Sequence, residues 1–196
     1  MAPSESGVTP EALSELLAKQ AITEVVFRYA RAIDRLDETL LRSVFHPGSR
    51  HNHFYEGPSS DPEAPTSAES PGDFVAFALG VLASFSRTHH QLGNTLIEFA
   101  DNENARVESY FTAFHRMRPR GDPLAAENAY DTEMDYFVGG RYIDRFALRN
   151  GEWKIIERVG MTDWTRVEPP ASQGFGEIDP RTVGHRAPDD FICQSD

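Results

Sequence analysis

Apolar residues in the first part of the chain recur every three or four positions, which is the period of an amphipathic α-helix. The pattern predicts a long helix over 10–34, with Thr9 as its N-cap and Pro10 at its first position. Its apolar side chains are Leu13, Leu16, Leu17, Ala21, Ile22, Val25, Val26, Tyr29, Ala30 and Ile33. A short helix is predicted over 37–45. A third, over 72–86, is apolar nearly all round, so we expect it to be packed on both sides.

After the third helix the apolar period changes to that of β-strands. Strands are predicted over 89–100, 105–117, 132–149 and 152–167, and "RNGE" between the last two is typical of a tight hairpin. Helices followed by an antiparallel sheet define the α+β class. We expect a cone-shaped barrel, in which a curved antiparallel sheet is wrapped around the long N-terminal helix and one end is open for a small molecule.

The length of 196 residues fits one domain. We expect a flexible leader over 1–9, the cone domain over 10–168, and a Pro- and Gly-containing tail over 169–196. The tail is either disordered or extended over the outer surface or a neighbouring subunit. The polar stretch 46–72 is predicted to be a long loop, with a short strand at 51–57.

Charge and composition narrow the classes of partner. Acidic residues number 31 against 19 basic ones, so the net charge of -12 argues against nucleic acid and anionic membranes, which both need a positive surface. The chain has no apolar run near the ~20 residues of a membrane span. The N-terminus lacks a signal pattern, and a single Cys193 excludes an internal disulfide. We therefore expect a cytoplasmic protein that binds a small-molecule substrate and forms a homo-oligomer, a dimer or trimer assembled through the sheet.

One carboxylate interrupts the apolar face of the first helix. Val26, Ala30 and Asp34 are spaced four residues apart and so share one stripe. Asp34 either ends the helix in solvent or is buried. A buried carboxylate needs a partner, because burying it unpaired is very costly, and a histidine is the natural one. "HHQLGNTLIEF" at 89–99 offers two adjacent histidines.

Four segments carry a resemblance to a known family. The helix end "YARAID", the segment "HHQLGNTLIEF", the strand "ESYFTAFHR" and the hairpin "GGRYIDRFALRNGEWKI" are together similar to the SnoaL-like branch of the nuclear transport factor 2-like superfamily, over about 10–168. That branch includes scytalone dehydratase, the hexachlorocyclohexane dehydrochlorinase and the bile-acid dehydratase. Its members host many chemistries, and some host none.

The resemblance implies a catalytic aspartate–histidine dyad. Asp34 matches the helix-end aspartate, and His90 matches the strand histidine because it begins the "H-x-x-G-N-T" pattern. His89 would then point to the opposite face of the pleat. Tyr29 matches a tyrosine of the bile-acid dehydratase and would donate a hydrogen bond to substrate.

Three further residues are candidates for substrate contact. His115 stands where scytalone dehydratase carries its second active-site histidine, and Arg158 stands where the dehydrochlorinase has a functional arginine. Arg158 has an alternative role as the cross-strand partner of a nearby acid, and His115 has one as a strand residue outside the pocket. Tyr55 belongs to the polar loop expected over the pocket.

These residues imply a cofactor-independent lyase of the dehydratase type, or an isomerase, acting on a small, apolar, cyclic substrate. We expect no metal, since no Asp, Glu or Cys completes a convincing set of ligands with His46, His51 and His53. The alternative from another class is a non-catalytic binding or assembly module, such as the small subunit of a ring-hydroxylating oxygenase. Contact between Asp34 and His90 is the feature that separates the two hypotheses.

Overall fold

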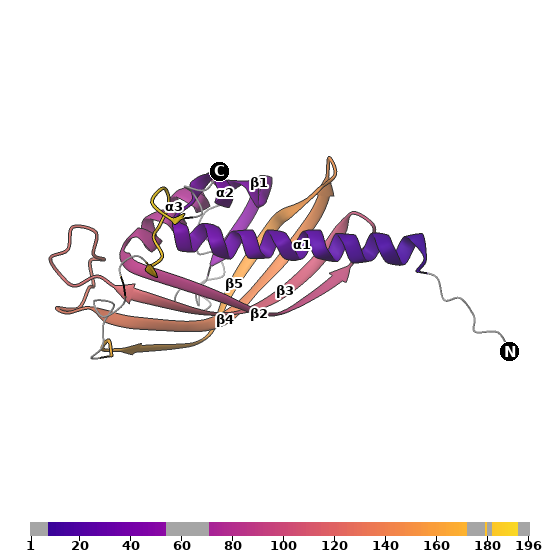
Figure 1. Cartoon of the computed structure of the whole chain (residues 1–196). Coiled ribbons are helices and arrows are strands. Elements are labelled where there is room, and N and C mark those ends of the chain that lie inside the picture. The colour runs from indigo at the N-terminus through magenta and orange to yellow at the C-terminus, as the bar shows by residue number, and fades with distance from the viewer. Residues whose placement is uncertain (1–7, 54–70, 172–178, 180–181, 192–196) are drawn as a thin grey trace, which may run out of the picture.

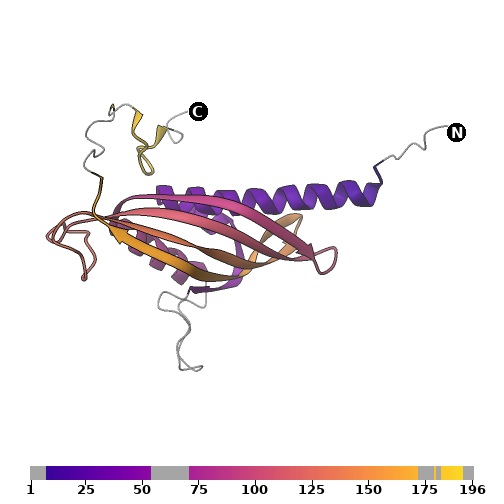
Figure 2. The same ribbon diagram turned by 90° about the horizontal axis from the view of Figure 1, so that it is seen from below.

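In the part of the chain that the structure describes, three helices pack on one face of a curved sheet (Figures 1 and 2). The computed structural model describes residues 8–53, 71–171, 179 and 182–191. The elements are α1 (Pro10–Arg35), α2 (Glu38–Ser43), β1 (Phe45–His53), α3 (Pro71–Ala83), β2 (Phe85–Phe99), β3 (Asn104–Met117), β4 (Met134–Arg149) and β5 (Glu152–Glu168). The predicted α+β class is therefore confirmed. None of the helices in these ranges is long and apolar enough to span a membrane.

The sheet has five strands in the order β1-β5-β4-β3-β2. The strands β2 to β5 pair with one another in antiparallel fashion, as predicted, whereas β1 pairs with β5 in parallel. The edge strands β1 and β2 do not pair with each other, so the sheet curves around α1 without closing into the expected barrel. The result is an open cone with α1 across its concave side.

The strand β2 shifts its register against β3 twice. Phe85 pairs with Met117 and Arg87 with Arg116, so β2 contains one more residue than β3 at this point. A second shift follows Leu92, before Thr95 pairs with Ser109. Such β-bulges reverse the face to which the following side chains point.

The long helix α1 begins where capping chemistry predicts. The Thr9 side chain accepts a hydrogen bond from the backbone N–H of Ala12, and Pro10 occupies the first turn. Leu36 ends the helix in the left-handed conformation. The buried side chains lie between Ile22 and Ile33. The first part of the helix extends past the sheet (Figure 2), which leaves the predicted apolar residues Leu13, Leu16 and Leu17 exposed.

Three boundaries of helices and strands differ from the predictions, because the residues there pair with neighbouring strands. The helix α3 ends at Ala83, and Phe85 already pairs with β3, so β2 begins before the predicted residue 89. The second helix ends at Ser43 because Val44 accepts a hydrogen bond from β5. The expectation that α3 is packed on both sides is wrong for the described chain, since Phe77 is 41% exposed. The rest of the strand predicted at 51–57 lies outside the described residues.

Candidate active site

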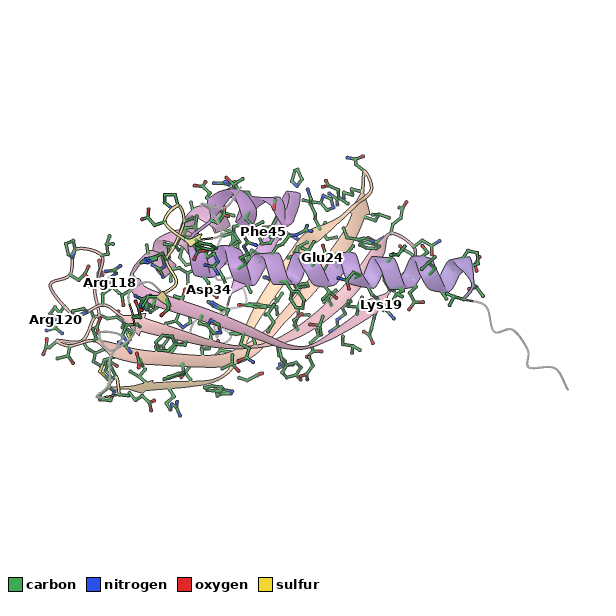
Figure 3. All side chains as sticks on the ribbon, viewed as in Figure 1. Lys19, Glu24, Asp34, Phe45, Arg118 and Arg120 are labelled. Carbon is green, nitrogen blue, oxygen red and sulfur yellow. The ribbon has the colours of Figure 1, made fainter. Side chains whose placement is uncertain are left out.

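A histidine and a carboxylate join the C-terminal end of α1 to β2. The ring nitrogen Nδ1 of His90 lies 2.7 Å from Oδ1 of Asp34, and the backbone N–H of His90 donates to Oδ2 at 2.8 Å. One residue thus occupies both oxygens of the carboxylate. Figure 3 shows Asp34 in the last turn of α1, beside the beginning of β2.

The protonation of this pair follows from its surroundings. Burial alone would raise the pKa of Asp34, but the hydrogen bonds and the charge of His90 outweigh it, and the pKa is lowered. Asp34 is therefore an anion at neutral pH and can only accept hydrogen bonds, so Nδ1 of His90 carries the proton. The other ring nitrogen, Nε2, remains available to a ligand.

A bulge in β2 decides which histidine faces the interior. Ile97 and Phe99 pack against the core, and strict alternation from them would turn His89 inward. The register shift after Leu92 reverses this, so His90 lines the interior cavity and His89 is exposed. The opposite orientations expected for the two histidines are therefore present.

A partly open cavity between α1, α3 and the sheet holds about 120 Å³. Its described wall is mostly apolar, and its polar groups are two imidazoles, three phenols and two hydroxyls. The lining residues are Tyr29, Ile33, Phe74, Ala78, Val81, Leu82, Phe85, His90, Phe111, His115, Tyr136, Val138, Tyr142, Thr162 and Thr165. None of these is Lys, Arg, Asp or Glu, so the wall favours an uncharged ligand.

His115 lies beside His90 in this wall. The two rings are perpendicular, with centroids 5.1 Å apart, and Nδ1 of His115 is buried without a hydrogen-bond partner among the described residues. Burial, together with the positive charge that His90 can carry, lowers the pKa of His115 to about 3. His115 is therefore neutral at physiological pH, and it can exchange hydrogen bonds with a ligand but carries no charge.

Arg158 lies beneath the cavity and does not line it. It is completely buried and binds Asp144 through two hydrogen bonds, from Nε at 2.7 Å and from Nη2 at 2.6 Å. Asp144 is its partner in the β4–β5 register, so the structure shows the cross-strand role given above as the alternative. The guanidinium also lies 3.8 Å from the ring centroid of Tyr29 and 4.3 Å from that of Tyr142. Burial would lower the pKa of Arg158, but Asp144 outweighs it and keeps the group charged.

Tyr29 is the third predicted catalytic residue, and it lines the cavity. Burial raises the pKa of its hydroxyl, although Arg158 opposes this, so the group stays protonated and can donate a hydrogen bond. Tyr55 lies outside the described residues.

Sequence reasoning missed the other polar residues of the wall. Tyr142 stacks on Phe111 with centroids 4.4 Å apart, and Tyr136 is paired with His115 across β3 and β4. Thr162 and Thr165 come from β5. Their positions depend on the register between strands. The sequence offered only the alternation of side chains along each strand, which does not show which face of the sheet points inward.

Comparison with known proteins decides the family. The model of the SnoaL-like domain matches residues 14–159, which is most of the chain. The chain belongs to the SnoaL-like family. The resemblance to SnoaL-like proteins seen in the sequence is thereby confirmed. A search of curated proteins found no match.

Several solved structures share this fold. A Type2 hexachlorocyclohexane dehydrochlorinase (LinA) is 17% identical, with a TM-score of 0.64 over 87% of this chain and 99% of that one. The LinA-type3 enzyme of Novosphingobium barchaimii is 15% identical, with a TM-score of 0.63 over 83% and 97%. A candidate scytalone dehydratase of Novosphingobium aromaticivorans is 21% identical, with a TM-score of 0.61 over 82% and 97%. At these identities the likeness establishes the fold alone.

Proposed function

We propose that the cavity is the active site of a cofactor-independent lyase of the dehydratase type, or of an isomerase that uses the same groups. The observation that carries the proposal is the Asp34–His90 pair, in which Asp34 holds one ring nitrogen of a histidine that lines the cavity. The family supports this direction, because its solved relatives include proteins described as dehydrochlorinases and a scytalone dehydratase.

His90 would be the general base. Imidazole suits this task because its ordinary pKa lies close to neutrality. Its Nε2 would take a proton from a carbon next to a carbonyl, and the electron pair of the broken C–H bond would form the new double bond as hydroxide leaves the adjacent carbon. The imidazolium would return the proton to that hydroxide, releasing water. In an isomerase the same proton would return to a different carbon.

The neighbouring groups would stabilise charge that develops during the reaction. Asp34 would fix the tautomer of His90 and stabilise the imidazolium. Tyr29, as a protonated phenol, would donate to the developing enolate oxygen, and the neutral His115 would bind the departing oxygen. Arg158 would act from beneath, by supporting Tyr29.

The wall favours a small uncharged ring as the substrate. Its volume of about 120 Å³ is close to that of an engineered apolar cavity of about 150 Å³ that binds benzene. A single six-membered ring carrying a carbonyl and a β-hydroxyl would fit, with its ring against Phe111 and Phe74.

The test is a panel of monocyclic β-hydroxyketones. Ligands would be selected by a rise in melting temperature and then followed by the absorbance of the conjugated product. We expect one compound to lose water, with kcat lower by about 100- to 10,000-fold in His90→Gln and nearly unchanged in the matched variant His89→Gln. Ligands that raise the melting temperature but yield no product, dehydrated or isomerised, would instead favour the binding-module alternative.

A further inference from the structure

A short segment near the C-terminus contacts the end of α1. We call residues 182–191 the strap. The backbone N–H of Ala187 donates to the carbonyl oxygen of Arg35 at 2.9 Å, and Asp190 forms an ion pair with the Arg35 side chain. The strap therefore holds the last residue of α1 through both its backbone and its side chain. Asp34 is the residue immediately before it.

The same strap contacts the beginning of β2. Arg186 donates from Nη1 to the carbonyl oxygen of Phe85 at 2.9 Å and from Nη2 to that of Leu82 at 3.2 Å. Arg87 donates to the carbonyl oxygen of Gly184 at 3.1 Å. These contacts fix the junction between α3 and β2, and β2 is the strand that carries His90.

One segment thus holds two elements that meet at the histidine–carboxylate pair. We propose that Arg186 and Asp190 are positioning residues, which hold the end of α1 and the start of β2 at the separation that the Asp34–His90 contact requires. Their effect on turnover rests on the proposed function, but the positioning itself is a property of the free protein. A displacement of about 1 Å at such a contact can cost about 100-fold in rate, even when the mutated residue is remote from the chemistry.

Three substitutions in the full chain test positioning, and two of them, Arg186→Lys and Asp190→Asn, separate it from simple electrostatics. Arg186→Ala does not, because it also removes a positive charge that interacts with Asp34. Arg186→Ala removes both hydrogen bonds, and Arg186→Lys keeps the charge but cannot reproduce the two-pronged contact. Asp190→Asn removes a negative charge at the end of α1, where Asp34 also lies. By charge alone, this change would lower the pKa of Asp34. Positioning predicts the opposite sign, because a loosened contact with His90 releases Asp34 from the bonds that lower its pKa.

The measurement is NMR on the labelled, ligand-free protein. The carboxyl carbon of Asp34 is titrated, and the Nδ1 proton of His90 is followed as the signature of the contact. We expect the pKa of Asp34 to rise in all three variants, with the His90 proton signal weakened or lost, and both readouts unchanged in the matched control Arg149→Ala. With a substrate in hand, kcat should fall more than KM changes.

Unchanged Asp34 and His90 signals in Asp190→Asn and Arg186→Lys, with only a lower melting temperature, would make the strap purely structural. A fall in the pKa of Asp34 in Asp190→Asn would likewise overturn positioning in favour of charge alone. If Arg186→Ala does not fold, the other two variants decide. Because the readout needs no turnover, failure of the strap proposal is distinguishable from failure of the proposed lyase.

Discussion

Replacement of Asp144 by asparagine tests the energetic basis of the cavity floor. Asp144 and Arg158 are both fully buried and share two short hydrogen bonds. Asparagine has the same shape but no charge, so Asp144→Asn leaves the guanidinium buried without its counter-ion. The two tyrosine rings beside Arg158 contact it before and after the change, so they do not compensate for the loss.

The size of the effect follows from this burial. Removing one partner of a buried ion pair typically costs about 3–5 kcal/mol, and because Asn still offers one acceptor we expect about 3 kcal/mol. In a chain of this length that corresponds to a fall of roughly 6–12 °C in melting temperature. Asp163→Asn is the matched control, since the Asp163–Arg141 pair is partly exposed and should contribute no more than about 1 kcal/mol.

Urea denaturation of the two variants measures both values directly. A cost for Asp144→Asn no greater than that for Asp163→Asn would refute the reasoning from burial. The double replacement Asp144→Leu with Arg158→Met should recover much of the loss, because apolar residues of similar volume often replace a buried ion pair at little cost.

Three other predictions address the rest of the fold and its assembly. Because the pKa of Asp34 is lowered in the folded state, its contribution to stability is present above its ordinary pKa and is lost as pH falls through the folded value. Urea denaturation should therefore show Asp34→Asn less stable than wild type at pH 7, with the gap closing below about pH 4. Gly140→Ala places a methyl group 2.0 Å from a main-chain oxygen of β5 and should cost about 1–3 kcal/mol by denaturation. Dimer or trimer assembly through the sheet stays a prediction; if it is correct, Trp164→Glu on the exposed face should lower the mass measured by light scattering.

Periodicity predicted the three helices and the strands β2 to β5 because each buries one face, and capping residues located the start of α1. It could not predict that β1 pairs in parallel with β5, since that pairing is between segments far apart in the sequence. The helix α3 was predicted too long because Phe85 is apolar in either state, and only its pairing with Met117 shows that it belongs to the sheet.

The candidate site, too, was predicted only in part from the sequence. The stripe through Asp34 left open whether this carboxylate is solvated or buried, and the family resemblance selected the buried alternative with His90 as its partner. Alternation alone, counted back from Ile97, would have selected His89, because it takes no account of the bulge between Leu92 and Thr95, where Gly93 lies. The Arg158–Asp144 pair and Tyr142 depended on cross-strand register, which the sequence does not specify.

The number of residues at the two bulges of β2 determines which of the adjacent histidines faces the cavity. Phe85 and His90 are separated by an odd number of positions, yet both line the cavity, which requires the extra residue at the first bulge. The stretch from Arg87 to Leu92 lies between the two bulges. Inserting or deleting one residue in it would turn the inward-facing side chains outward and bring their neighbours inward. Since β2 is an edge strand, β3 is the single strand whose pairing such an indel would disturb, although the contacts of β2 with α1 and with the strap would shift as well. In a closed barrel, the same slip would have to be accommodated on both sides. In an open sheet, the residue that an edge strand presents to the cavity can therefore change through a change of length as well as through substitution.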